Sequence, residues 1–138
     1  MAVLIDACVL IEAERGRLDL GAHVAHRTDD GVFLSVITAS ELLHGVHRAS
    51  SPDRRARRAA FAEAVLSRLP VLDIDLPTAR AHARLWADLA AAGTPVCPHD
   101  LWLAATCVAR GLTLVTANER EFRLIPALDV EVWQVAAP

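Results

Sequence analysis

Four oxygen-bearing side chains lie next to short apolar runs or at the starts of helical patterns in this sequence: Asp6, Glu41, Asp100 and Asn118. Because ligands of a doubly wound α/β sheet bind beyond the carboxyl ends of its strands, we expect these side chains to converge on one edge. Clustered carboxylates repel one another, so such a cluster implies bound protons or a bound cation. A hard, all-oxygen site suits Mg²⁺ or Mn²⁺, which serve phosphoryl chemistry above all.

Each of these residues also has a purely structural explanation. Asp6 can cap a helix that follows the first strand. Glu41 lies three residues after Thr38, which is the spacing of a capping box, and Asp100 lies near a helix N-terminus, where the helix dipole favours a carboxylate. Asn118 and Glu121 can be simply a turn residue and a surface residue. The case for a site therefore depends on the whole set.

The elements that must position these residues are short apolar runs alternating with longer helical patterns, which favours a parallel α/β sheet. We expect four or five strands, at residues 2–5, 32–36, 71–74, 113–116 and 130–135. Four helices have readable ends, and we expect them at about residues 38–48, 52–69, 79–92 and 98–110. Glu41 and Asp100 then lie in the first turns of two of these helices.

The composition indicates one well-buried domain, which we expect to span residues 1–138. The chain is 54% hydrophobic and 22% charged, which excludes an intrinsically disordered protein. No apolar run approaches the roughly 18 to 20 residues of a membrane-spanning helix, and no secretory signal opens the chain. We therefore expect a cytoplasmic protein with no membrane partner.

The charges and cysteines exclude two further classes of protein. A formal net charge of -3 argues against a histone-like nucleic-acid binder, although a nuclease whose acidic residues bind metal remains compatible with it. Cys8, Cys97 and Cys107 are far apart and form no CxxC pair, so we expect neither a disulfide framework nor a zinc site. We interpret them as reduced core thiols.

Four segments of the sequence carry a resemblance to a known family. They cover residues 3–6, 36–42, 99–106 and 114–118, which read VLID, VITASEL, HDLWLAAT and LVTAN. In the same order and over the whole chain, they resemble the motifs of the PIN-domain ribonucleases, and within these the VapC toxins of VapBC toxin–antitoxin modules. No single motif is highly specific, but four in order at these spacings make a strong match.

The resemblance implies an α/β fold, a PIN-like three-layer domain with a parallel four- or five-stranded sheet flanked by helices. It implies a Mg²⁺-dependent endoribonuclease, with Mn²⁺ as a substitute, in which a metal-activated water hydrolyses RNA phosphodiester bonds. It also implies a homodimer that is silenced by a small VapB-type antitoxin. Trp86 lies in a helical apolar stripe that is either core or dimer interface.

Carried over residue by residue, the family's acidic catalytic and metal-binding positions are Asp6, Glu41 and Asp100. The fourth metal position, often aspartate in the family and sometimes asparagine, is Asn118 here. A neutral amide is a weaker ligand, so we expect a second metal to bind weakly at most. Glu121, three residues on, is a further candidate ligand if it turns inward.

Two more residues bear on this site. Arg48 lies about two helical turns after Glu41 and hence on the same helix face, where it can contact RNA phosphate. Cys8 stands where the family commonly has asparagine or serine, and we expect this difference to remove a polar group beside Asp6.

Other functions remain to be weighed against the ribonuclease. A Rossmann dinucleotide binder is rejected, because Asp6-Ala7-Cys8 follows the first strand in place of a GxGxxG turn. A phosphatase with an aspartate nucleophile typically needs a second acid two residues later, where Cys8 stands, so it is a minor alternative. The main alternative is a catalytically silent PIN module that binds RNA or a partner protein.

Overall fold

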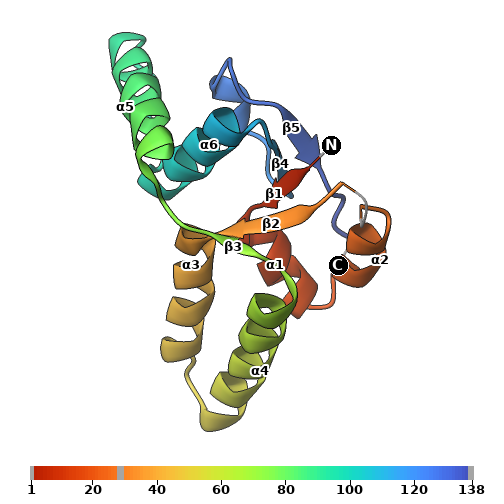
Figure 1. Ribbon diagram of the computed structural model, residues 1–138. Helices are drawn as coiled ribbons and strands as arrows, with labels where there is room; N and C mark the ends of the chain where they lie inside the picture. Colours follow the sequence, from red (N-terminus) through yellow and green to blue (C-terminus); the bar gives the residue numbers. More distant parts are fainter. Residues whose placement is uncertain (1, 28–29, 137–138) are drawn as a thin grey trace.

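The computed structural model describes residues 2–27 and 30–136, in which five short strands form one parallel sheet (Figure 1). The strands are β1 (Val3–Ile5), β2 (Val32–Ser35), β3 (Val71–Leu72), β4 (Thr113–Thr116) and β5 (Val130–Val132). Their spatial order is β3-β2-β1-β4-β5, and each strand runs parallel to its neighbours. The predicted parallel sheet is confirmed, although β3 and β5 end earlier than predicted.

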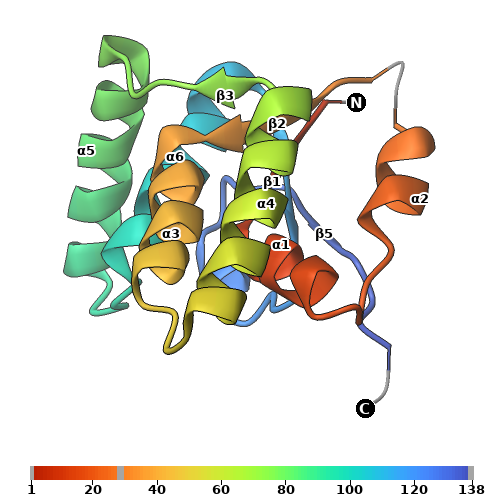
Figure 2. The same ribbon diagram turned by 90° about the horizontal axis from the view of Figure 1, so that it is seen from below.

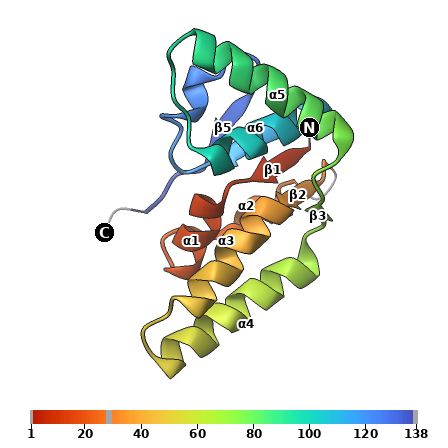
Figure 3. The same ribbon diagram turned by 90° about the vertical axis from the view of Figure 1, so that its left-hand side faces the viewer.

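Helices cover both faces of the sheet, as a three-layer fold requires. Over the described ranges they are α1 (Ala7–Glu14), α2 (Leu20–Ala25), α3 (Val36–His47), α4 (Pro52–Arg68), α5 (Leu76–Ala91) and α6 (Pro98–Arg110), with a short 3₁₀ turn, η1 (Phe122–Leu124). Figures 1 and 3 show α5 and α6 on one face and α1, α3 and α4 on the other. In Figure 2, where the second group lies in front, α2 stands apart from it, on the side of β5.

Strand β1 illustrates how the two halves of the core are formed. Val3 and Ile5 pack in a cluster with residues of α1, α3 and α4, whereas Leu4 packs with residues of α5 and α6. Because successive side chains of a strand point to opposite faces, a strand covered on both sides reads as an unbroken apolar run. The polar residue that follows such a run therefore lies at the carboxyl edge of the sheet.

Helix α3 begins at Val36, and its N-cap lies three residues before Thr38, the N-cap of the predicted capping box. Ser35 is the N-cap, and its hydroxyl accepts a hydrogen bond of 3.0 Å from the backbone N–H of Ile37. Thr38 is fully buried inside the helix, and its hydroxyl has no hydrogen-bond partner within the described residues. The capping box of Thr38 and Glu41 is therefore wrong, and Glu41 lies in the second turn of α3.

The two helices on the other face differ in how well their starts were predicted. Helix α6 begins at Pro98 as expected, and Gly111 ends it with a φ of 67°, a left-handed conformation that favours glycine. Helix α5 begins at Leu76, earlier than predicted, because the Asp75 carboxylate caps it by accepting a 2.9 Å hydrogen bond from the backbone N–H of Thr78. Asp100 keeps its predicted place in the first turn of α6.

All three cysteines are free, as predicted, but they do not share one environment. Cys107 is buried and Cys8 is partly buried, whereas Cys97 is exposed at the N-cap of α6. The interpretation as core thiols is therefore wrong for Cys97. Among the helices of residues 2–27 and 30–136, none combines the length and the apolar character needed to cross a membrane.

Candidate active site

Asp6 lies at the carboxyl edge of the sheet, between β1 and β4. Its backbone N–H donates a 2.8 Å hydrogen bond to the carbonyl of Val115, and its carboxylate Oδ2 accepts one of 3.0 Å from the hydroxyl of Thr116. Asp6 is only 7% exposed and precedes α1, but its side chain makes no capping hydrogen bond to that helix. The structural explanation of Asp6 as a helix cap is therefore wrong.

Cys8 is a second partner of the Asp6 carboxylate. Its thiol donates a 2.9 Å hydrogen bond to Oδ2 of Asp6, and its sulfur accepts one of 3.3 Å from the backbone N–H of Ala117. Burial, and next the charge of Asp6, raise the pKa of Cys8 to about 11, so the thiol stays protonated as a donor at neutral pH. The expected loss of a polar group at this position does not occur.

Asp100 lies among the other carboxylates at this edge. Its pKa is raised to about 7, first by burial and next by a hydrogen bond with Glu121. The negative charges of Asp6, Glu121 and Glu41 act in the same direction. The structure therefore brings Asp6, Glu41 and Asp100 within electrostatic reach of one another, as the sequence predicted, and it turns Glu121 toward Asp100.

Glu41 approaches the cluster from α3 and contacts a histidine of α6. Its Oε1 lies 3.1 Å from Nδ1 of His99, the residue before Asp100. Burial raises the pKa of Glu41, the nearby His99 opposes that rise, and the charge of Asp6 adds to it. The negative charge of Asp6 therefore raises the pKa of Glu41 as well as that of Asp100.

Asn118 follows β4 at the same edge, but its contacts are local. Its backbone N–H donates a 3.0 Å hydrogen bond to the hydroxyl of Thr116, and its side-chain oxygen accepts one of 3.4 Å from the backbone N–H of Arg120. The side chain is exposed. In this conformation the amide oxygen closes a turn, so its role as a metal ligand stays a prediction.

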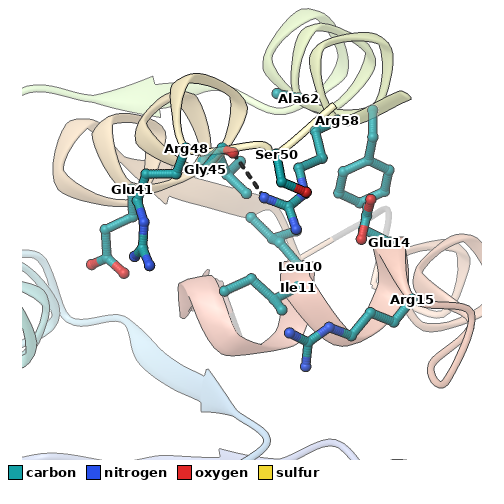
Figure 4. Close-up of a pocket in the computed structure, with 12 residues that line it drawn as sticks. Leu10, Ile11, Glu14, Arg15, Glu41, Gly45, Arg48, Ser50, Arg58 and Ala62 are labelled. Atoms are coloured by element: carbon teal, nitrogen blue, oxygen red, sulfur yellow. Dashed lines mark hydrogen bonds between the residues drawn. The ribbon is translucent and has the colours of Figure 1, made fainter. Parts of the chain in front are cut away.

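A pocket of about 370 Å³ extends from Glu41 between α1, α3 and α4 (Figure 4). Arg48, the C-cap of α3, lines it beside Glu41, and Arg58 crosses it to donate a 2.9 Å hydrogen bond to the carbonyl of Gly45. Apolar side chains complete the lining, Leu10 and Phe61 among them. Arg48 and Glu41 thus face one cavity, as their spacing predicted.

The donor set of this edge fits a hard divalent cation. Carboxylates in mutual electrostatic contact leave an excess of negative charge, which the raised pKa of Asp100 reflects. Within the described part of the chain, no three His, Cys, Asp or Glu side chains are already arranged to hold a metal ion. Mg²⁺ keeps several of its waters and needs only one or two carboxylates, so this arrangement is compatible with it.

Two polar neighbours of the carboxylates were not assigned a role from the sequence. Thr116 was recognised only as the end of a strand, although a buried hydroxyl at the carboxyl end of β4 is a signal in itself. His99 directly precedes Asp100 in the sequence, but its partner is Glu41, which lies 58 positions away in the numbering and on another helix. Only the packing of α6 near α3 reveals that pair.

The fold and the carboxylate cluster define the class of protein. The family model for the PIN domain matches residues 3–128, so the chain belongs to the PIN-domain family. It is 41% identical over 100 residues to the tRNA(fMet)-specific endonuclease VapC of Salmonella typhimurium, covering 72% of this chain and 74% of that one. It is 36% identical over 134 residues to ribonuclease VapC5 of Mycobacterium tuberculosis, covering 97% of this chain and 96% of that one.

A solved structure supports the same assignment. The crystal structure of DNA-bound VapBC from Salmonella typhimurium matches with a TM-score of 0.86 at 32% identity, covering 96% of this chain and 98% of that one. Together with the curated relatives, this places the chain among the VapC ribonucleases of the PIN-domain family.

Proposed function

We propose that this protein is a metal-dependent endoribonuclease and the toxin of a VapBC-type toxin–antitoxin module. The observation that carries the proposal is the meeting of Asp6, Glu41 and Asp100 at one edge of the sheet, where burial, a hydrogen bond with Glu121 and the neighbouring negative charges together raise the pKa of Asp100. Such crowding at a surface edge has no benefit for folding, whereas a cation offsets it. The VapC names of the relatives support RNA as the substrate.

The proposed metal is Mg²⁺, with Mn²⁺ as a substitute, held by Asp6 and Asp100. When bound there, the ion would supply Lewis acidity toward a scissile phosphate and toward a water molecule. Thr116 and Cys8 fix Oδ2 of Asp6 in place by donating hydrogen bonds to it. Glu41 orients the attacking water in line with the leaving 3′-oxygen, and Arg48 contacts a phosphate of the RNA farther along the pocket.

The proposed partner is a VapB-type antitoxin. The similar Salmonella structure contains VapBC, and here the pocket between α1, α3 and α4, lined by apolar side chains and by Arg48 and Arg58, opens beside Glu41. We expect an antitoxin segment to cover this pocket and to present an arginine to the carboxylates. We expect the two proteins to co-purify, and a complex that cleaves RNA as fast as the free protein would exclude blockade of the site.

We also propose that the chain acts as a cytoplasmic homodimer and forms one domain over residues 1–138. Trp86 is 63% exposed on α5, so its interpretation as a core residue is wrong and the dimer interface is favoured. It lines an apolar groove between α5 and α6 together with Leu89 and Leu101. Sedimentation equilibrium of the wild type and of Trp86→Ser tests this: a dimer that the substitution weakens is the expected result.

RNA cleavage by the purified, antitoxin-free chain tests the activity. Total RNA and transcribed tRNA(fMet), the target named for the Salmonella relative, are incubated with Mg²⁺, with Mn²⁺ and with EDTA. Cleavage that EDTA abolishes and that either metal restores is the expected result. RNA binding without cleavage under every metal condition would favour the silent PIN module, and cleavage that persists in EDTA would exclude the metal mechanism.

A further inference from the structure

The contact between His99 and Glu41 joins the two helical layers of the molecule. Nδ1 of His99 lies 3.1 Å from Oε1 of Glu41. Glu41 belongs to α3, on one face of the sheet, and His99 to α6, on the other (Figures 1 and 3). The pair therefore closes the gap between these layers at the carboxyl edge, where the candidate active site lies.

Glu41 has Arg48 beside it in the pocket, but toward the other carboxylates of the site it faces negative charge. The charge of Asp6 raises its pKa, and Asp100 feels the charge of Glu41 in turn. In the described ranges, the ion pair found for the Glu41 carboxylate is the one with His99. Without a donor, repulsion from these aspartates favours rotamers that carry the Glu41 carboxylate away from the site.

Because His99 is the neighbour of Asp100 in the chain, its contact with Glu41 also fixes where Glu41 lies relative to Asp100. His99 directly precedes Asp100 in the first turn of α6. One rigid helical turn therefore carries both a metal-binding carboxylate and the donor that holds the Glu41 carboxylate. An Nδ1–H group donates in the neutral ring as well as in the charged one, so the contact needs no particular charge state.

We propose that His99 is a positioning residue, which holds the Glu41 carboxylate at the reaction centre through a hydrogen bond donated by Nδ1. This inference rests on the proposed ribonuclease function. His99 is itself 57% exposed in its side chain and does not pack in the core, so a role in stability does not explain its contact. Its action on the reaction passes through Glu41.

Three substitutions of His99 separate hydrogen bonding from shape. In His99→Asn the side-chain amide nitrogen takes the place of Nδ1, in His99→Gln it takes the place of Nε2, and in His99→Phe the ring stays but the donor is lost. His26→Phe is the matched control, because His26 is an exposed histidine at the C-cap of α2, outside the site. All variants are compared by RNA cleavage under the metal conditions that activate the wild type.

We expect His99→Phe to lower kcat by about tenfold or more with little change in KM, in line with the loss of a group that orients an active-site ligand. His99→Asn is expected to recover most of the rate. His99→Gln is expected to be as slow as His99→Phe, whereas the control His26→Phe is expected to match the wild type. Equal rates for the Asn and Phe variants, or recovery by Gln in place of Asn, would overturn the inference.

A spectroscopic measurement tests the contact independently of activity. In metal-free protein labelled with ¹⁵N-histidine, we expect Nδ1 of His99 to carry a proton and its resonance to shift in Glu41→Ala. An unprotonated Nδ1, or a resonance that ignores Glu41→Ala, contradicts the inference. If the contact is present but the wild type cleaves no RNA with either metal, the proposed function fails, and the catalytic role of His99 fails with it.

Discussion

The hydroxyl of Thr116 lies 3.0 Å from Oδ2 of Asp6, so the last residue of β4 holds the residue that follows β1. These strands are parallel neighbours, and the register pairs Ile5 with Val115. The next residue of each strand therefore meets its counterpart at the carboxyl edge. This geometry fixes an aspartate that would otherwise be free to rotate, and it assigns Thr116 a place in the site.

Replacing Thr116 by valine tests that relationship. Valine keeps the branched shape but removes the hydroxyl that donates to Asp6, so we expect RNA cleavage to fall by about 10- to 100-fold. Thr116→Ser is the matched control, because it retains the hydroxyl, and it should keep most of the activity. Equal activity of the wild type and Thr116→Val, with both folded by circular dichroism, would show that the hydrogen bond has no role in the reaction.

The stability of the metal-free protein should depend on pH through Asp100. Its pKa is about 7 in the folded chain against an ordinary value of 3.8, so the folded state holds this proton more tightly than the unfolded state. Between these two values unfolding releases the proton, and the stability contributed by Asp100 therefore decreases as the pH rises through that window. We expect the Tm in EDTA to fall from about pH 5 to about pH 8.

Asp100→Asn isolates the contribution of this carboxyl group. The variant cannot ionise at this position, so its Tm should fall less over the same range and should exceed that of the wild type at the higher pH. Differential scanning calorimetry in EDTA measures both proteins. A Tm of Asp100→Asn well below the wild type at the higher pH would mean that Asp100 is a structural residue of the helix start.

The sequence predicted the parallel sheet and four of the helices from local patterns, and it predicted the proximity of the three carboxylates from the topology of such a sheet. It gave no bounds for α1 and missed α2. Apolar runs locate buried strands, and Pro98 and Gly111 mark the ends of α6. It failed where two local signals compete: Ser35 and Thr38 can both cap a helix, and only packing decides that Thr38 is buried. It also could not find contacts between distant residues, such as that of His99 with Glu41.

The residue at the fourth metal position, Asn118, decides whether a second metal ion binds tightly or weakly. An amide oxygen brings no charge, and here that of Asn118 accepts a hydrogen bond from Arg120, so we expect Asn118→Asp to strengthen Mn²⁺ binding in the absence of RNA. Glu121 interacts with Asp100, and Glu121→Gln should therefore weaken Mn²⁺ binding. Calorimetric titration measures both, and two equally tight sites in the wild type would contradict this account of Asn118.

Arg48 should contribute to RNA binding more than to the chemical step. It lines the pocket beside Glu41, and removal of one phosphate contact reduces the salt dependence of binding by about one unit of slope. We therefore expect Arg48→Ala to raise KM with little change in kcat. Arg57→Ala, an exposed arginine of α4 outside the pocket lining, is the control. Equal salt slopes for the wild type and Arg48→Ala would exclude the phosphate contact.

The central claim is that the carboxylates at the edge of β1 and α6 bind the divalent cation that the reaction needs. The most direct test is calorimetric titration of Mn²⁺ into metal-free wild type, Asp6→Asn and the control Asp53→Asn, an exposed aspartate in the first turn of α4. The account predicts saturable binding in the wild type and in Asp53→Asn, and its loss in Asp6→Asn. Binding of equal affinity in Asp6→Asn, or none in the wild type, would contradict it.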